Sequence, residues 1–243
     1  MTTTRTRTTT RTRIPRQPIG GIRVSARPFT DYTAQFALTD DDLKRGPILD
    51  CPGGASDFAA TVRARGGRAV SADPCYGQPL RTLNLLVDRD LECINEWISS
   101  QPGRFPLDEN NAWCGLKAWR GAADTFLTDI ERDRSSGLGR YVAASLPRLP
   151  FPDNAFALAV SGFLLFTYPE FLDFRFHVAA IHELLRVATE VRVHPLNDSA
   201  GNPYPGLNAL TDHLAADGIR CDLLEVPGQS DTQDRRTLRL SRS

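Results

Sequence analysis

The sequence predicts an α/β protein built on a Rossmann-like, doubly wound sheet of seven strands, mostly parallel and ending in an antiparallel hairpin. Short apolar runs alternate with helical patterns from residue 47 onward, as in strands joined by helical crossovers. A glycine turn directly follows the first apolar run. The chain closes with two extended runs, 220–226 and 236–240, separated by a polar turn that is typical of a hairpin.

The first unit is a strand, a glycine turn, a helix and a second strand. Ile48 and Leu49 form the first strand, and Gly53 and Gly54 allow a tight turn and a close approach to a ligand. The backbone amides of such a turn and the amino end of the following helix favour polar or anionic groups. The second strand ends at Asp73, where a carboxylate can accept both hydroxyls of a ribose. The order of these elements predicts a nucleotide pocket.

The later elements follow from the same patterns. Helical turns are expected over Phe29–Leu43, near the mouth of the first strand. The remaining expectations are strands at 140–145, 156–161 and 189–194, a helix that opens at Tyr168-Pro169-Glu170 and ends near Arg186, and a last helix at 207–216. The fourth strand is apolar on both faces, as central parallel strands are.

Residues 76–140 are longer than one crossover requires. Two helical patterns occupy this stretch, the first around Leu83–Ile98 and the second around Trp113–Ile130. A crossover helix needs about a dozen residues. We therefore expect a helical insertion within a single domain, 29–243, and regard the insertion as a candidate substrate lid; the alternative is that both helices cover the sheet with their aromatic residues in the core.

Composition limits the partners that the domain can have. The 29 basic and 29 acidic residues cancel, so no overall field favours nucleic acid or a membrane surface. No apolar run approaches the ~20 residues of a membrane span. Residues 1–28 alternate threonine and arginine with few apolar residues, which predicts a disordered tail, with an organelle transit peptide as the alternative.

The five cysteines are odd in number and scattered, without a Cys-x-x-Cys pair. This pattern favours reduced thiols in a cytoplasmic protein over disulfides or zinc. His177, His182 and Glu183 share one helix but do not match a metal-binding motif, so no metal is expected. His194 at the end of a strand is either a general base or, by preference, a histidine that hydrogen-bonds a loop.

Four segments together resemble class I S-adenosylmethionine-dependent methyltransferases, over residues 29–243. They are Asp50-Cys51-Pro52-Gly53-Gly54-Ala55-Ser56, Asp73, Leu149-Pro150-Phe151-Pro152-Asp153-Asn154-Ala155-Phe156 and His182-Glu183-Leu184-Leu185-Arg186-Val187. The Leu-Pro-Phe-Pro-Asp segment is the most specific, because it follows the third strand where the family has its adenine loop. More narrowly, the chain resembles an uncharacterised, divergent bacterial branch of that family.

The resemblance implies S-adenosylmethionine as the cofactor and an unidentified small molecule as the methyl acceptor of a monomer or homodimer. The cofactor-binding positions that it implies are Asp50, Pro52, Gly53, Gly54, Ala55, Asp73, Pro74, Ser145, Leu146 and Ser161. Asp50 would help to hold the amino group and Asp73 the ribose hydroxyls. Ser145 and the Leu146 amide would meet the adenine. The sulfonium is already activated, so the protein contributes positioning and exclusion of water, and no catalytic residue is assigned.

The sequence departs from the family pattern in ways that keep alternatives open. Pro52 and Ser56 replace the first and last glycines of the turn, and proline lacks an amide donor. Ser145 replaces the usual acid. An enzyme that cleaves S-adenosylmethionine without moving its methyl group, a dinucleotide-dependent reductase and a non-catalytic binding protein remain as alternatives. Tyr168, Tyr32 and Tyr76 are candidate aromatic residues at the mouth of the sheet, with Tyr76 placed against adenine.

Overall fold

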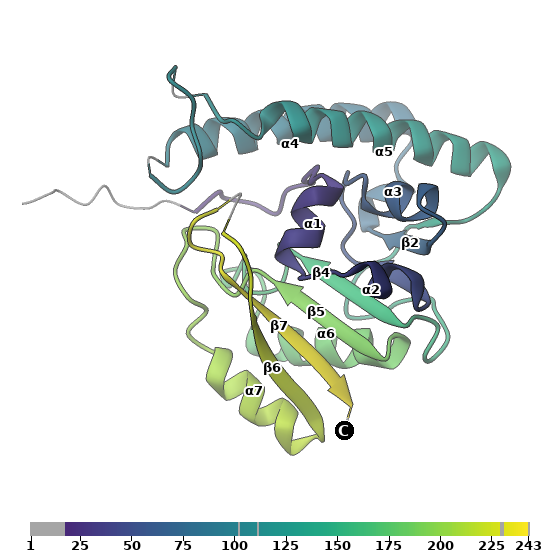
Figure 1. Ribbon diagram of the computed structural model, residues 1–243, viewed down its shortest axis with the longest axis vertical. Coiled ribbons are helices and arrows are strands. Elements are labelled where there is room, and N and C mark those ends of the chain that lie inside the picture. The colour runs from purple at the N-terminus through teal and green to yellow at the C-terminus, as the bar shows by residue number, and fades with distance from the viewer. Residues whose placement is uncertain (1–17, 102, 111, 229–230, 243) are drawn as a thin grey trace, which may run out of the picture.

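The computed structural model describes residues 18–101, 103–110, 112–228 and 231–242 as a single sheet with helices on both faces (Figure 1). The strands run in the order β3-β2-β1-β4-β5-β7-β6. Their bounds are β1 Pro47–Asp50, β2 Arg68–Ala72, β3 Tyr141–Val142, β4 Leu158–Gly162, β5 Glu190–His194, β6 Ile219–Glu225 and β7 Arg236–Arg242. Pairing is parallel except around β7, which is antiparallel to β5 and to β6. The predicted fold class is confirmed.

Alternation along the central strands directs side chains to two separate cores. The helices are α1 Phe29–Gln35, α2 Asp40–Lys44, α3 Phe58–Ala64, α4 Leu80–Ser99, α5 Leu116–Ser136, α6 Phe174–Val187 and α7 Leu207–Ala216. Ile48 of β1 packs with α1 and α3, whereas Leu49 packs with α6 and α7 on the opposite face. Both faces of the sheet are therefore covered, as parallel sheets require.

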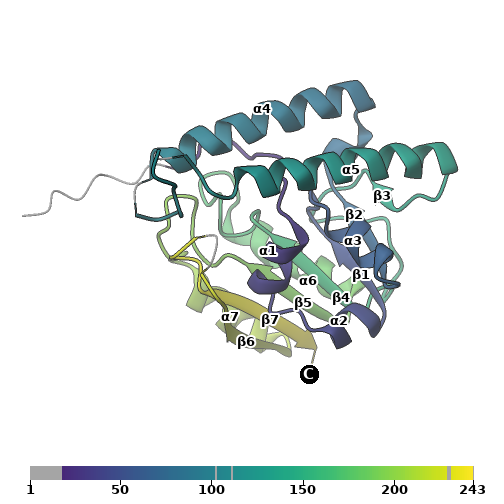
Figure 2. The ribbon, with the colours of Figure 1, turned by 45° about the horizontal axis from the view of Figure 1, so that its top comes forward.

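Helices α4 and α5 lie side by side across one side of the molecule and form a third cluster with the residues around Tyr76 (Figures 1 and 2). This pair is the predicted helical insertion. Neither it nor any other helix among the described residues is long and apolar enough to cross a membrane.

Two predicted boundaries were wrong. The helix expected to open at Tyr168 begins instead at Phe174, because Asp173 accepts a hydrogen bond from the Phe176 amide and caps it. The third strand, expected over 140–145, pairs only at Tyr141 and Val142, since it lies at the edge of the sheet beside β2 alone.

The structure describes only the last part of the tail predicted over residues 1–28. Residues 1–17 lie outside the described part of the chain. Residues 18–28, which we call the covering segment, contain no helix or strand but are fixed by hydrogen bonds to the domain, and Ala26 is fully buried. The prediction of disorder was wrong for this segment, because its contacts come from residues far away in the sequence.

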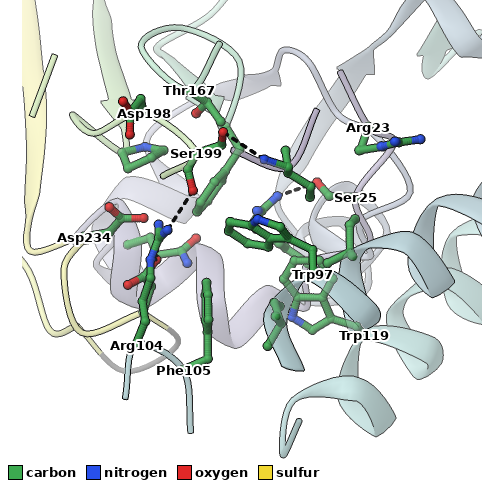
Figure 3. A pocket seen from close by; sticks show the side chains of 18 of the residues that line it. Arg23, Ser25, Trp97, Arg104, Phe105, Trp119, Thr167, Asp198, Ser199 and Asp234 are labelled. Carbon is green, nitrogen blue, oxygen red and sulfur yellow. Dashed lines mark hydrogen bonds and ion pairs between the residues drawn. The ribbon is translucent and has the colours of Figure 1, made fainter. Parts of the chain in front are cut away.

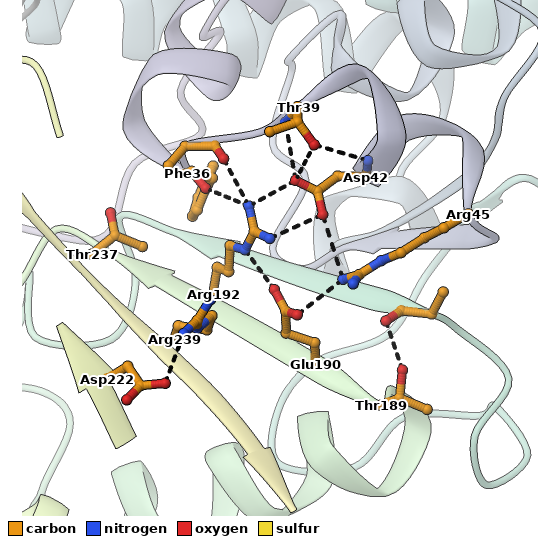
Figure 4. A network of polar contacts seen from close by, with 12 residues as sticks. Phe36, Thr39, Asp42, Arg45, Thr189, Glu190, Arg192, Asp222, Thr237 and Arg239 are labelled. Atoms are coloured by element: carbon orange, nitrogen blue, oxygen red, sulfur yellow. Dashed lines mark hydrogen bonds and ion pairs between the residues drawn. The ribbon is translucent and has the colours of Figure 1, made fainter. Parts of the chain in front are cut away.

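Arg192 of β5 joins the sheet to the turn between α1 and α2 (Figure 4). Its guanidinium donates to the carbonyls of Phe36 and Ala37, both at 2.9 Å, and to both carboxylate oxygens of Asp42, at 3.2 and 3.0 Å. Glu190 accepts from its Nε at 2.7 Å. This buried network holds α1 against the strand ends, where Tyr32 and Phe36 face a cavity.

Candidate functional site

A cavity of about 290 Å³ lies at the carboxyl ends of β1, β2, β3 and β4, and we call it the strand-end cavity. Of the predicted cofactor-binding residues, six line it: Pro52, Gly54, Asp73, Pro74, Ser145 and Leu146. The rest of the lining includes Tyr32 of α1, Gly162 at the end of β4, Phe163 after it, residues of the covering segment and Phe176 of α6. The carboxyl ends of the strands are where doubly wound sheets bind ligands.

Asp73 holds the glycine turn in place. One carboxylate oxygen accepts the Gly54 amide at 3.0 Å and the other accepts the Cys75 amide at 2.9 Å. A carboxylate offers about four lone-pair sites, so each oxygen can accept a further hydrogen bond. Asp73 is 7% exposed and lines the strand-end cavity, so a ligand in that cavity can donate hydrogen bonds to the remaining lone pairs of its carboxylate.

Four of the predicted cofactor-binding residues do not line the strand-end cavity. Asp50 lies beneath the turn, where it accepts hydrogen bonds from Tyr32, Ser56 and Ser71 at 3.1 to 3.4 Å. Gly53 donates to the Ala72 carbonyl, and Ala55 is fully buried and donates to Ser25. Ser161 is buried and its hydroxyl has no partner in the described part of the chain. Cofactor binding was predicted for these positions, for Asp50 either directly or through water. The turn directs Asp50, Gly53 and Ala55 into the protein, and Ser161 is buried within β4.

The three candidate tyrosines have different positions. Tyr32 lines the strand-end cavity, and its hydroxyl lies between that cavity and Asp50. Tyr76, expected against adenine, is instead buried among Phe126 and Tyr141 and donates to the Gly54 carbonyl at 2.8 Å. Tyr168 lines a second cavity, described below.

His194, a candidate general base, contacts the first residues of β7 instead of a ligand cavity. His194 is fully buried, and its Nδ1 lies 3.0 Å from the Thr237 hydroxyl and 3.2 Å from the Arg236 carbonyl. Burial, followed by the charge of Arg27, lowers the pKa of His194 to about 3, so the ring is neutral. Among the described residues no group of three or more His, Cys, Asp or Glu side chains is arranged to hold a metal ion.

The buried carboxyl group of Asp50 gives the stability a pH dependence. Burial raises its pKa to about 8, although the hydrogen bonds from Tyr32 and Ser56 act in the opposite direction. The unfolded value is near 3.9. The folded chain therefore binds more protons than the unfolded chain between pH 4 and 8, and the free energy of unfolding contributed by this group falls as pH rises through that window.

We expect Asp50→Asn to remove this dependence, because the amide stays neutral. Urea unfolding from pH 5 to 8 should show the wild type losing stability relative to the variant by up to about 1.4 kcal/mol per pH unit. Every other titrating group is common to both chains, so the difference isolates Asp50. A constant difference across this range would contradict the assignment.

A second cavity of about 70 Å³ adjoins the first, and we call it the aromatic cavity (Figure 3). Its apolar walls include Trp97, Phe105, Trp113, Trp119, Phe163 and Tyr168. Its polar residues come from the covering segment, α1, the loops after β4, α4 and β5, and the loop between β6 and β7. The insertion thus supplies part of this cavity, and each tryptophan both packs in the core and lines it.

The covering segment forms the wall that the two cavities share, through Arg23, Ser25 and Arg27 together with Phe163. The Ser25 carbonyl accepts the Ala55 amide at 2.9 Å, and the Val24 amide donates to Asp90 of α4 at 2.9 Å. The Arg23 amide donates to the Tyr168 hydroxyl at 3.3 Å. The segment is therefore attached to the glycine turn, to the insertion and to the loop after β4.

Arg27 is a cation in this wall without a paired carboxylate. It stacks on Phe163 and Trp119, with its guanidinium carbon 3.1 and 4.7 Å from the ring centres, and its Nε is buried without a hydrogen bond. No carboxylate of the described residues is within ion-pair distance of it. Burial lowers the pKa of Arg27 to about 10. A buried cation of this kind is costly unless a ligand supplies an anion.

The covering segment and the loop between β6 and β7 were not predicted to belong to the site. A signal for the first was present: the Thr/Arg repeat gives way after residue 18 to apolar residues at Ile19, Ile22 and Val24. The contribution of Asp231 and Asp234 had no such signal, because acidic residues in a hairpin loop are ordinary.

Comparison with known proteins adds relatives of limited similarity. No family model matches the chain. An uncharacterized protein of Methanocaldococcus jannaschii is 29% identical over 177 residues, which cover 72% of this chain and 78% of that protein.

The sheet order decides the fold. Strand β7 is antiparallel and lies between β5 and β6, at the end of an otherwise parallel sheet. The fold is that of the class I methyltransferases.

Solved structures with this methyltransferase fold are similar to the chain at low identity. The pyocyanin biosynthetic protein PhzM is 12% identical with a TM-score of 0.46, over 88% of this chain and 54% of PhzM. The chain thus spans about half the length of PhzM. The magnesium protoporphyrin IX methyltransferase ChlM of Synechocystis PCC 6803, solved with bound S-adenosylmethionine, is 13% identical with a TM-score of 0.44, over 88% of this chain and 77% of ChlM.

Proposed function

We propose that this protein is an S-adenosylmethionine-dependent methyltransferase that acts on a small molecule. The observation that carries the proposal is the pair of adjoining cavities with one shared wall. The strand-end cavity takes the cofactor, and the aromatic cavity takes the acceptor. Methyl transfer requires the two ligands to be in direct contact, so the proposal requires this wall to open between the Arg27 and Phe163 side chains when both ligands are bound.

The residues of the strand-end cavity fit the cofactor chemically. Asp73 has free acceptor capacity for the two ribose hydroxyls. The unpaired guanidinium of Arg27 matches the carboxylate of the methionine part, and Arg23 Nε is a second buried donor without a partner. Ser145 and Leu146, which the resemblance assigns to adenine, line the same cavity. Bound S-adenosylmethionine supplies a methyl group already activated by its sulfonium.

Calorimetric titration tests the cofactor, and product analysis tests the reaction. We expect saturable binding of S-adenosylmethionine and S-adenosylhomocysteine and none of NAD. Turnover should release S-adenosylhomocysteine. Release of methylthioadenosine would instead support an enzyme that cleaves the cofactor without methyl transfer, and the absence of binding to all three compounds would support a non-catalytic protein.

Gly54→Val should abolish measurable binding of S-adenosylhomocysteine. Gly54 has a φ of +53°, and a Cβ there would approach the Ser25 carbonyl oxygen to 2.6 Å, so the larger side chain displaces the shared wall. The matched control is Gly137→Val, at a φ of +63° with no atom within 4 Å of the added Cβ. Both variants carry the backbone strain, but only the first disturbs the cavity. Equal affinities in a calorimetric titration would refute the assignment.

A further inference from the structure

Asp234 is a buried carboxylate that lines the aromatic cavity without a cation of its own. It is 5% exposed, just before β7, and one oxygen accepts from Asn197 at 2.8 Å. The neighbouring Asp231 takes the available cation, since Arg104 donates to it at 2.7 Å. Within the described part of the chain, Asp234 forms no ion pair. Its second oxygen therefore remains for a donor in the cavity.

Two further buried oxygen atoms of the same cavity lack partners. They are Gln35 Oε1 and Thr167 Oγ1, from α1 and from the loop after β4. Each residue is 6% exposed. Buried polar atoms are normally satisfied, so these two oxygens, together with the acceptor capacity of Asp234, indicate a ligand that brings N–H or O–H groups. The aromatic walls indicate that the body of this ligand is planar and apolar.

The charges of the cavity argue against an anionic ligand. Arg23 is paired with Asp90, and Arg104 is paired with Asp231. Arg27 is assigned above to the cofactor carboxylate. Asp198 and Asp234 then remain as carboxylates without a cation, so a carboxylate or phosphate on the acceptor would meet repulsion and no counter-ion.

We propose, on the basis of the function proposed above, that the acceptor is an uncharged planar molecule that presents an O–H or N–H group to Asp234. Asp234 is then a specificity-determining residue. Gln35 and Thr167 accept further hydrogen bonds from the same ligand, and the ring lies among the tryptophans of the insertion.

The groups that face Asp234 determine how recognition depends on pH. They are Asp231 from its own loop, Arg104 from the loop after α4, Arg27 from the covering segment, and Asn197 and Asp198 from the loop after β5. Burial, followed by the charge of Asp231, raises the pKa of Asp234 above its ordinary value. A donor binds the carboxylate form more strongly than the protonated form. Affinity should therefore be highest where Asp234 is ionised and fall as the pH drops through this raised pKa.

The experiment uses the tryptophans as the reporter, because all three in the chain line this cavity. The full-length protein, saturated with S-adenosylhomocysteine, is titrated with phenol, aniline and benzoate, which are similar in size. We expect saturable fluorescence changes with phenol and aniline and at least tenfold weaker binding of benzoate. Phenol affinity should fall about tenfold from pH 8 to pH 5.

Asp234→Asn should weaken phenol binding about tenfold at pH 8 and remove its pH dependence. The matched control is Asp212→Asn, an exposed position on α7, which should behave as the wild type. The pH profile of the wild type needs no variant and tests the proposal even if Asp234→Asn fails to fold. Tighter binding of benzoate than phenol, no saturable binding of phenol or aniline, or an unchanged pH profile in a folded Asp234→Asn would overturn it.

The same titrations separate the two proposals. Calorimetry with S-adenosylhomocysteine tests the cofactor assignment by itself, and Asp234→Asn should leave that affinity within about twofold. If the wild type does not bind S-adenosylhomocysteine, the proposed function fails, whereas phenol binding measured without it, and its loss in Asp234→Asn, still decides whether Asp234 recognises an O–H donor.

Discussion

Arg192→Met should lower the free energy of unfolding by about 3–5 kcal/mol. The side chain is 7% exposed, and its guanidinium is the shared partner of Asp42, Glu190 and two backbone carbonyls. Methionine fills a similar volume but leaves these acceptors buried without a donor. Burial alone would raise the pKa of Asp42, but its hydrogen bonds and Arg192 together hold that pKa below its usual value.

The control for Arg192→Met is Arg239→Met, on the neighbouring strand β7. Arg239 pairs with Asp222 at 2.9 Å, but these side chains are 37% and 29% exposed, and exposed pairs are worth ~0–1 kcal/mol. Chemical denaturation of both variants measures the contrast. Equal losses would mean that the buried network does not fix α1 to the sheet.

Asp73→Asn should weaken S-adenosylhomocysteine binding by about 100-fold or more, a loss of about 2.7 kcal/mol. Hydrogen bonds to a charged acceptor are worth about 1.5–3 kcal/mol each, and the proposed ribose contact has two of them. The amide also cannot accept from both Gly54 and Cys75, since one of its two terminal atoms is a donor. The turn is therefore disturbed together with the ligand contact.

Two measurements separate these effects at Asp73. Thermal unfolding without ligand reports the turn, where we expect a loss of about 1–3 kcal/mol for one unsatisfied amide. Calorimetry on the folded variant reports the ligand. Asp88→Asn, an exposed position on α4, should change neither. Affinity retained within threefold would remove Asp73 from the cofactor site.

Local patterns predicted the fold well because each element carries its own signal. The apolar pair Ile48 and Leu49, the apolar fourth strand and the final hairpin could each be recognised in a short window of sequence. In the structure Ile48 and Leu49 point to opposite faces of the sheet. The β-turn that carries Gly54 was also predictable. The ends of the helices and strands were less predictable, since α6 is capped by Asp173 and does not begin at Pro169.

The direction of side chains in the turn could not be predicted, because it depends on the three-dimensional course of the backbone. Asp50 and Gly53 match a motif in sequence, yet both face the protein interior. The aromatic cavity is a further case. Asp234, Arg27 and Trp119 are brought together by packing alone, with no spacing that relates them.

The covering segment has a consequence for the order in which the protein matures. Ile19 bonds to Ser199, and Arg23 to Tyr168, across 180 and 145 positions of the chain. The covering segment is synthesised early, but it cannot form these hydrogen bonds until its partners have been synthesised. Closing so large a loop also has an entropic cost. A nascent chain can build β1, α3 and β2 long before its two cavities are separated. Competence for both ligands is then among the last properties that a newly made molecule acquires.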